Sequence, residues 1–293
     1  MLMGVSITHP DKVVWPDAGD GRPVTKLDLA RYFEAMAGWI MPHIRGRPCS
    51  ILRAPDGVPG PVFFQRHAGS HASPHFEEVR LDNEHAPYLV FNRPQALIDC
   101  AQIGAIELHP TGCAPDRPDT PGRLVFDFDP DDGAPLEAVI EAAQDVRSRL
   151  EAIGLAPFCR TTGGKGLHVV VPLRTENLGW DEAKGLSRRV CEQMVADRPD
   201  LYVAKTAKAL RKGKIFLDYL RNDRLSTAIA LLSPRARLGA TVAMPLDWNE
   251  VRPGLDPKAF TVRTAPALVE RRNPWRDYEN AGGSLASARD RLK

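Results

Sequence analysis

A short run of alternating residues constrains the fold and chemistry of this chain more than any other feature. The segment Leu124–Asp129 consists of Leu-Val-Phe-Asp-Phe-Asp, which predicts a β-strand because its residues favour extended structure. Successive side chains point to opposite faces, so Asp127 and Asp129 share one face. Two carboxylates one pleat apart can bind a divalent metal together, since Mg²⁺ and Mn²⁺ prefer oxygen ligands. The alternative is a strand that simply enters the turn at Pro130–Gly133.

A glycine-rich segment, Arg160–His168, holds the second group of candidate residues. It consists of Arg-Thr-Thr-Gly-Gly-Lys-Gly-Leu-His and continues into three valines, which predicts a turn followed by a strand. The segment lacks the spacing of a Walker A loop, and no helix follows it. Its glycines still allow the backbone to approach a phosphate, with Lys165 beside them. A glycine-rich hairpin with a chance histidine is the other interpretation.

A third segment, Lys212–Arg221, places Asp218 inside an apolar strand. An aspartate in such a strand is costly to bury unless it is paired or bound to a metal. Asp218 could therefore form a salt bridge with Arg221 or Arg224, or it could be a third metal ligand.

Composition limits the possible partners and environment. The 293 residues can bury a large core, in one elaborate domain or two fused lobes. The net charge is only +2, so nucleic-acid binding would depend on local basic clusters, such as Lys205–Lys214. The five cysteines show no CxxC spacing and suggest reduced structural thiols. Without a signal peptide or a membrane-length apolar run, we expect a cytoplasmic protein with no membrane partner.

The order of predicted elements indicates an α/β (α+β) fold. Thr25, with Asp28 three residues later, predicts the capped start of a helix in an N-terminal lobe of about residues 1–105. Helices at about 136–153 and 181–196 alternate with the strands, which suits a catalytic unit like an RNA-recognition motif (RRM-like). We expect that lobe to cover about residues 106–250. The Pro-rich, charged tail, residues 251–293, is expected to wrap the surface.

Aromatic and histidine residues in the N-terminal half add further candidates. Strand alternation places His109 on the same face as Glu107. The alternative is that His109 is an ordinary histidine at the end of a strand. The turn before Phe63 and Phe64 should expose one of these rings, and exposed rings can stack on bases. His67, His71 and His75 have a spacing that would suit a metal on a helix, but the surrounding Gly, Ser and Pro favour a loop without metal.

The three motifs in this order resemble the archaeo-eukaryotic primase superfamily, and more closely the polymerase domain of bacterial DNA ligase D. The resemblance runs nearly end to end. It includes four flanking segments: Thr8–Pro16, Arg53–Gly57 with Phe63–His67, Arg235–Arg237 and Pro245–Trp248.

The resemblance implies a primase-like fold with an RRM-like catalytic unit and a second, N-terminal lobe. It implies an enzyme that extends a primer 3′-OH with ribonucleoside or deoxyribonucleoside triphosphates. Such an enzyme would fill gaps and add nucleotides at double-strand break ends during bacterial non-homologous end joining. Asp127, Asp129 and Asp218 would be the catalytic residues and would hold two divalent ions, Mn²⁺ or Mg²⁺.

The resemblance also assigns binding residues. The expected nucleotide-binding set is His109, Thr162, Gly163, Gly164, Lys165, His168, Arg221, Arg235 and Arg237. Thr162 stands where the family usually has serine, and its hydroxyl leads us to expect a preference for ribonucleotides. The expected DNA-binding set is Lys12 and Lys26 for a 5′-phosphate, Arg53, Phe63 and Phe64 at the DNA surface, and Arg211 in a loop that aligns DNA ends.

Expected partners are DNA ends with a 5′-phosphate, nucleoside triphosphates, Ku and a DNA ligase domain, possibly on the same full-length chain. The chain lacks the Lys-x-Asp-Gly ligase motif, so we expect sealing by another module. The protein would act in the bacterial cytoplasm, at the nucleoid.

Three other functions compete with this interpretation. A replicative-type primase would share the metal site, but the usual primase zinc cysteines are absent. A metal-dependent phosphohydrolase would give the glycine segment and the Phe63–Phe64 pair no role. A non-catalytic RRM-like binding protein would not need Asp218 in an apolar strand.

Overall fold

The computed structural model describes residues 1–69, 73–131 and 133–292. Two compact units can be distinguished by their internal contacts. The first unit comprises Met1–Thr111, Thr227–Met244 and Asp256–Arg272, and the second comprises Gly112–Ser226, Pro245–Leu255 and Asn273–Lys293. Each unit gathers segments from separate parts of the chain, whereas the predicted lobes are contiguous. The predicted lobe boundaries remain predictions.

A six-stranded sheet forms the centre of the second unit. Its strand order is β13-β14-β10-β12-β11-β15, and all neighbours are antiparallel except β13 and β14. The strands are β10 (Arg123–Pro130), β11 (Phe158–Thr161), β12 (Leu167–Pro172), β13 (Tyr202–Val203), β14 (Ile215–Asp218) and β15 (Pro245–Leu246).

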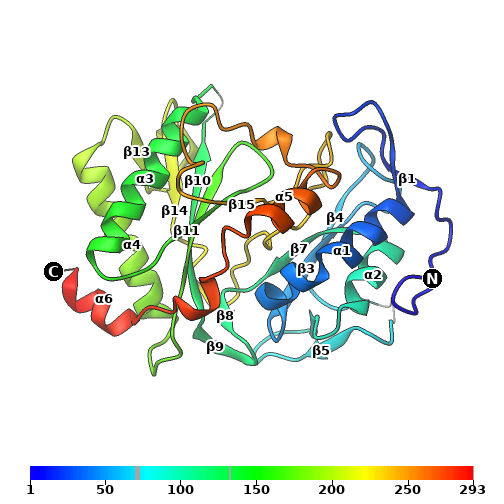
Figure 1. Cartoon of the computed structure of the whole chain (residues 1–293). Coiled ribbons are helices and arrows are strands. Elements are labelled where there is room, and N and C mark those ends of the chain that lie inside the picture. The colour runs from blue at the N-terminus through cyan, green and yellow to red at the C-terminus, as the bar shows by residue number, and fades with distance from the viewer. Residues whose placement is uncertain (70–72, 132, 293) are drawn as a thin grey trace. The chain divides into compact units, whose positions relative to one another are not determined.

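Helices α3 (Leu136–Ala152) and α4 (Trp180–Asp197) pack beside each other on one face of this sheet (Figure 1). The order along the chain is β10-α3-β11-β12-α4-β14, and these strands lie in the sheet as β14-β10-β12-β11. That arrangement is the βαββαβ fold of the ferredoxin and RRM type. The predicted RRM-like unit is therefore confirmed, and both helices lie within two residues of their predicted bounds.

The first unit contains a sheet in which β3 pairs with β4, β6 and β7, and β5 pairs with β6. Its strands and helices are β1 (Val13–Trp15), β2 (Val24–Thr25), α1 (Lys26–Ile44), β3 (Pro48–Arg53), β4 (Phe63–Gln65), β5 (Glu77–Val79), β6 (Tyr88–Val90), α2 (Gln95–Gln102), β7 (Ala105–Pro110) and α5 (Ala265–Arg272). Thr25 caps α1 as predicted. Its hydroxyl accepts a hydrogen bond from Asp28 N at 3.2 Å, and Thr25 N donates to the Asp28 carboxylate at 2.9 Å.

The segment beyond Arg252 does more than wrap the surface, which corrects the expectation for this tail. Trp275 and Tyr278 stack with ring centroids 4.9 Å apart, and both are buried. Trp275 Nε1 donates a hydrogen bond to Cys159 O at 2.9 Å, so the tail joins the second unit beside β11. The charged composition of the tail suggests exposure to solvent, but these aromatic side chains bury a large apolar area. The second unit also contains β8 (Cys113–Ala114), β9 (Arg117–Pro121) and α6 (Leu285–Arg291).

All five cysteines are buried thiols, consistent with the structural role predicted for them. No helix in the described ranges combines the length and apolar character needed to cross a bilayer.

Candidate active site

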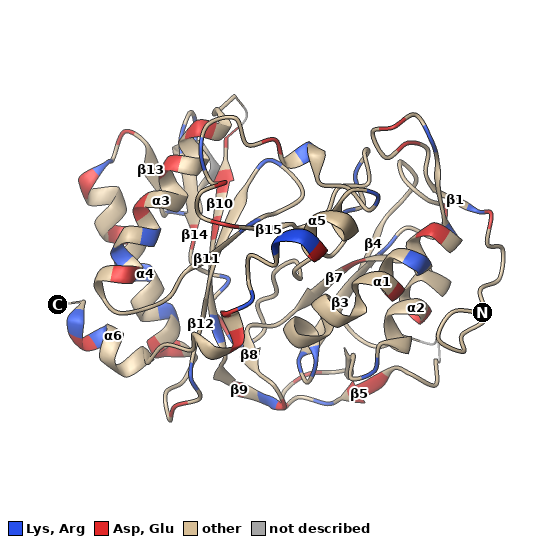
Figure 2. Cartoon of the chain, viewed as in Figure 1, with Lys and Arg blue, Asp and Glu red and all other residues tan. Residues whose placement is uncertain are grey.

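Strand pairing aligns four polar residues in one row across the sheet of the second unit. Arg160 pairs with His168, His168 pairs with Asp127, and Asp127 pairs with Asp218. Directly paired residues share a face, and Asp129 joins this face because it lies two residues after Asp127. One carboxylate oxygen from each of the three aspartates lies within 4.8 Å of those from the other two. Figure 2 shows acidic residues on β10.

Asp127 is the buried centre of the row. Arg221 Nε lies 3.2 Å from Asp127 Oδ2 and 3.2 Å from Asp218 Oδ2, so one guanidinium links two carboxylates. His168 Nε2 lies 3.1 Å from the other oxygen, Asp127 Oδ1. Burial works to raise the pKa of Asp127, but its contacts with His168 and Arg221 lower that pKa to about 2. Asp127 is therefore ionised at neutral pH.

The hydrogen bonds around His168 fix its protonation. Arg160 Nη2 donates to His168 Nδ1 at 3.1 Å, and a guanidinium cannot accept a hydrogen bond. Nδ1 is therefore the acceptor, and Nε2 holds the proton that faces Asp127. Burial lowers the pKa of His168, which agrees with a neutral ring. Arg160 is not among the site residues that the sequence predicts.

The other two aspartates are harder to ionise. Burial and the charge of Asp127 together raise the pKa of Asp129 to about 6, against the opposing charge of Arg221. Burial also raises the pKa of Asp218. Asp127 Oδ1 is buried, and His168 Nε2, 3.1 Å away, is the polar group that faces it. The clustered carboxylates match the oxygen ligands that Mg²⁺ and Mn²⁺ prefer, so the residues fit a divalent metal site.

The glycine segment forms the predicted turn, which joins β11 to β12 as a hairpin. Thr162 Oγ1 donates to Gly166 O at 3.1 Å and accepts from Gly164 N at 3.3 Å, so the hydroxyl helps to shape the turn. Gly163 has φ +67°, a backbone region that favours glycine. A Cβ added to Gly166 would lie 2.6 Å from Phe128 O, so glycine allows this turn to approach β10 closely. Lys165 is exposed.

A second polar cluster surrounds Glu107 in the first unit. Glu107 Oε2 lies 2.8 Å from His109 Nε2, while Glu107 Oε1 accepts from Arg235 Nε at 3.1 Å and Ala236 N at 2.8 Å. Burial works to raise the pKa of Glu107, but the hydrogen bond with His109 and the charge of Arg235 lower it to about 2. Strand alternation predicts that Glu107 and His109 share a face, but it predicts no role for Glu107. Arg237 is exposed two residues beyond Arg235.

Two aromatic rings are exposed near this cluster. The exposed fraction is 57% for Phe63 and 52% for Phe64, so both rings face solvent where one was predicted to do so. Phe64 meets His109 edge-on, with ring centroids 5.3 Å apart.

Lys12, Lys26 and Arg53 line one cavity of about 780 Å³ in the first unit. Lys26 N donates to Lys12 O at 2.8 Å, which ties the two lysines together. Burial lowers the pKa of Lys26, and the nearby charge of Lys12 lowers it further. Lys12 Nζ also lies 3.6 Å from Asp56 Oδ1.

Arg211 lies beside β14 in the second unit. Its guanidinium stacks over the Phe216 ring, 3.6 Å from the centroid, and Nη2 donates to Thr206 O at 2.8 Å. The positive charge of Arg211 also acts to lower the pKa of Asp129 and Asp218.

The predicted site residues thus fall into two sets. The second unit brings together the three aspartates, His168, Arg221, the Thr162–Lys165 turn and Arg211. The first unit holds His109 with Arg235 and Arg237, the exposed phenylalanines, and the cavity of Lys12, Lys26 and Arg53.

Comparison with known proteins identifies the family. The model of the family "LigD, primase-polymerase domain" matches residues 25–275. The multifunctional non-homologous end joining protein LigD of Pseudomonas aeruginosa is 33% identical over 97% of this chain. The bifunctional non-homologous end joining protein LigD of Bacillus subtilis is 26% identical over 94% of it. The chain spans 34% and 44% of the lengths of these two relatives.

Among solved structures, the polymerase domain from Mycobacterium tuberculosis Ligase D in complex with DNA matches with a TM-score of 0.84 and 31% sequence identity. The match covers 95% of this chain and 99% of that one, so the predicted primase-like fold is confirmed. The chain belongs to the LigD primase-polymerase domain family, whose members are DNA-directed nucleotidyltransferases with the archaeo-eukaryotic primase fold.

Proposed function

We propose that this chain extends primers at DNA double-strand breaks during bacterial non-homologous end joining, using two divalent metal ions and preferring ribonucleotides. The three aspartates on one sheet face, with oxygens within 4.8 Å of one another, are the main support for this proposal. The end-joining proteins similar to this chain support the biological setting.

Asp127, Asp129 and Asp218 would hold the ions, Mn²⁺ or Mg²⁺. Ions bound there would supply positive charge to an in-line displacement at phosphorus. The primer 3′-hydroxyl would lose its proton to solvent, and its oxygen would form a bond to the α-phosphorus of the incoming nucleotide. The bond from that phosphorus to the pyrophosphate oxygen would break, and pyrophosphate would leave. Arg221 and His168, which the resemblance assigns to nucleotide binding, would also hold Asp127 in position through the contacts described above.

His109, Lys165, Arg235 and Arg237 would neutralise the triphosphate, whose negative charge shifts toward pyrophosphate in the transition state. Glu107 would be a positioning residue for two of them. Its carboxylate contacts both His109 and Arg235, so it fixes their orientation while keeping its own charge buried.

Thr162 would favour ribonucleotides through the substrate 2′-hydroxyl. The Thr162 hydroxyl proton is directed to Gly166 O, so the threonine oxygen would accept the hydrogen bond from the 2′-hydroxyl. Gly163 and Gly164 would let the backbone of the turn approach the nucleotide.

The first unit offers groups for the DNA end. The Lys12–Lys26–Arg53 cavity would bind a 5′-phosphate, since two ammonium groups and a guanidinium line it. Phe63 and Phe64 would stack on exposed bases. Arg211 would contact DNA during end alignment. Ku and a ligase domain would be the protein partners, in the cytoplasm at the nucleoid.

Extension of a labelled primer on a gapped duplex, with Mn²⁺ or Mg²⁺, tests the proposal. Asp127→Ala and Asp218→Ala should abolish nucleotide addition. Asp181→Ala, which removes an exposed carboxylate on α4, is the control and should retain full activity. Near-normal extension by either site variant would contradict the metal assignment. Synthesis on an unprimed template at a comparable rate would favour the replicative-type primase instead.

A further inference from the structure

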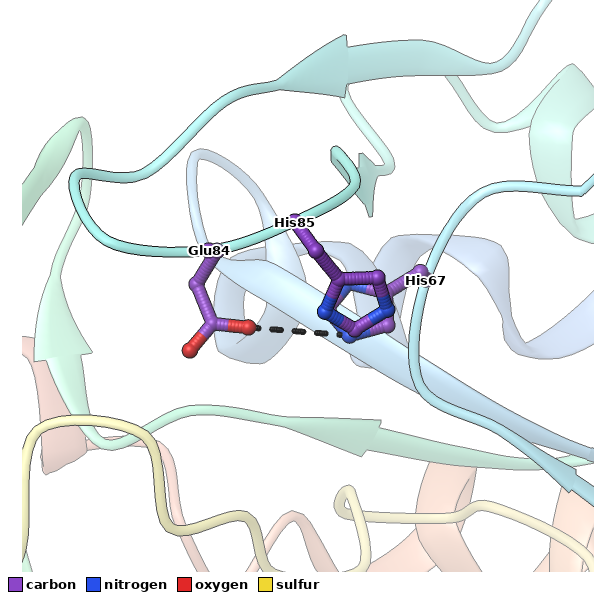
Figure 3. A group of neighbouring side chains, drawn as sticks. All are labelled: His67, Glu84 and His85. Carbon is purple, nitrogen blue, oxygen red and sulfur yellow. Dashed lines mark ion pairs between the residues drawn. The ribbon is translucent and has the colours of Figure 1, made fainter.

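Three potential metal ligands outside the acidic site lie together in the first unit. They are His67, after β4, and Glu84 and His85, before β6 (Figure 3). One ligand atom from each residue lies within 4.8 Å of those from the other two. The rings of His67 and His85 have centroids 4.3 Å apart, and His67 Nε2 lies 3.6 Å from Glu84 Oε2.

Neighbouring contacts hold these ligands in place. Ala68 N donates to Pro87 O at 2.7 Å, which ties together the two loops that supply the ligands. Tyr88 is fully buried, packs against the His67 ring at 4.7 Å and donates from its hydroxyl to Glu84 Oε2 at 3.3 Å. A hydrogen bond to a ligating carboxylate is typical of the groups that orient metal ligands.

The distances suit an ion better than a direct hydrogen bond. The 3.6 Å separation of His67 Nε2 and Glu84 Oε2 exceeds hydrogen-bond length. Two ligands about 2.0–2.2 Å from one tetrahedral zinc lie roughly 3.4 Å apart. His67 Nδ1 is buried and has no hydrogen-bond partner within the described part of the chain. Hydrogen bonding therefore does not account for the position of this ring.

We propose that His67, Glu84 and His85 bind one zinc-type divalent ion, which clamps the loop after β4 to the loop before β6. Two imidazoles and a carboxylate form a ligand set that favours zinc over magnesium, whereas the three aspartates offer only oxygen. His85 is exposed, so an ion can enter from solvent.

This ligand set differs from the histidine series noted in the sequence. His75 Nδ1 lies 2.7 Å from Asp99 Oδ2 and is engaged there, and His71 lies outside the described residues. Glu84 and His85 were not candidates, because their approach to His67 depends on the pairing of separate loops.

Zinc titration of the full chain tests the site, monitored by calorimetry with Zn²⁺ and by visible absorption with Co²⁺. In one series of titrations, excess Mg²⁺ occupies the aspartate cluster of the parent protein. In a second series, the double variant Asp129→Asn/Asp218→Asn weakens metal binding at that cluster. We expect each protein to bind one equivalent of zinc. His85→Ala and Glu84→Gln should weaken binding by at least roughly 10- to 100-fold, the loss that removal of a group supporting a ligand already causes. Zinc should raise the melting temperature of the parent but not of His85→Ala.

His75→Ala is the matched control, because it removes a nearby histidine that bonds Asp99 instead. It should leave zinc affinity unchanged. Unchanged affinity in His85→Ala, or an equal loss in His75→Ala, would overturn this ligand set, as would the absence of a magnesium-resistant zinc site. None of these measurements uses primer extension. A result that disproves the proposed polymerase function would therefore leave the test of the zinc site unaffected.

Discussion

His168 on β12 and Asp127 on β10 face each other as a directly paired couple, with His168 Nε2 3.1 Å from Asp127 Oδ1. Arg160 Nη2 donates a hydrogen bond to the other ring nitrogen, His168 Nδ1, at 3.1 Å. The proposed metal-binding carboxylate of Asp127 is therefore backed by a neutral histidine, whose orientation is set by an arginine on the next strand.

Replacing His168 should slow catalysis more than it weakens nucleotide binding. His168→Ala removes the donor that faces Asp127, whereas His168→Gln keeps an N–H group. We expect kcat to decrease in the order wild type, Gln, Ala, with a loss of roughly tenfold or more for Ala, and a smaller change in nucleotide KM. Steady-state single-nucleotide addition measures both constants. Equal kcat values for the three proteins would show that His168 does not position Asp127.

The sequence predicted the elements whose signals are local. The alternation around Asp127, the Thr25–Asp28 capping box and the glycine hairpin each depend on residues within a few positions of one another, and the structure contains all three elements. The residue pattern alone indicates Asp127, Asp129 and Asp218 as possible metal ligands, and the resemblance to a known family supplies most of the other site assignments. All of these assignments remain predictions.

Features set by strand register or by contacts between distant parts of the chain are not evident from the sequence. Arg160 gains its place beside His168 from the register of β11 and β12, which the sequence does not specify. Glu107 meets Arg235 across 128 positions in the chain. Trp275 joins the second unit through Cys159, and no periodicity in the tail indicates that contact.

Glu107→Gln should raise the nucleotide KM roughly tenfold with a smaller effect on kcat. The variant loses the negative charge that orients Arg235 and His109, although the pocket becomes more positive. A lower KM would mean that net charge, and not orientation, limits nucleotide binding. Kinetics with one ribonucleotide on one gapped duplex separate these outcomes.

The same glutamate should make stability depend on pH in the acid range. Its pKa is lowered from 4.5 to about 2 in the folded protein. A lowered carboxylate pKa stabilises the fold above pH 4.5, and this contribution is lost as the pH falls toward 2. The contribution is roughly 3 kcal/mol, at about 1.4 kcal/mol per pKa unit. Chemical unfolding between pH 3 and 6 should show a steeper acid loss for wild type than for Glu107→Gln, and parallel curves would contradict the prediction.

Removing the Thr162 hydroxyl should reduce the preference for ribonucleotides. Thr162→Val keeps the shape of the side chain but cannot accept a hydrogen bond from the 2′-hydroxyl, while Thr162→Ser retains the hydroxyl. For Thr162→Val, we expect the ratio of ribonucleotide to deoxyribonucleotide addition rates to fall by roughly 5- to 10-fold, the equivalent of one hydrogen bond. For Thr162→Ser, the ratio should stay close to that of wild type. An unchanged ratio in Thr162→Val would place sugar selection elsewhere. The melting temperature of each variant controls for loss of the turn hydrogen bonds.

Lys12 and Lys26 should make binding sensitive to a 5′-phosphate at the far side of a gap. The backbone of α1 contributes less than a helix start usually would. Lys26 N donates to Lys12 O, Leu27 N donates to Pro10 O, and Asp28 N donates to Thr25 Oγ1. These N–H groups are engaged within the protein, so the lysine side chains must supply most of the attraction.

The test compares 5′-phosphate and 5′-hydroxyl duplexes at one salt concentration. Wild type should bind the phosphorylated duplex more tightly, by roughly tenfold, since each added phosphate contact strengthens binding electrostatically. Lys12→Ala/Lys26→Ala should bind both duplexes equally. Lys258→Ala removes an exposed lysine of the same unit and should keep the full preference. If the double variant also keeps it, the phosphate binds outside this cavity. Raising the salt concentration should reduce the difference in affinity between the two duplexes for wild type, because counterions screen the attraction between lysine and phosphate. The double variant should show no such difference at any salt concentration.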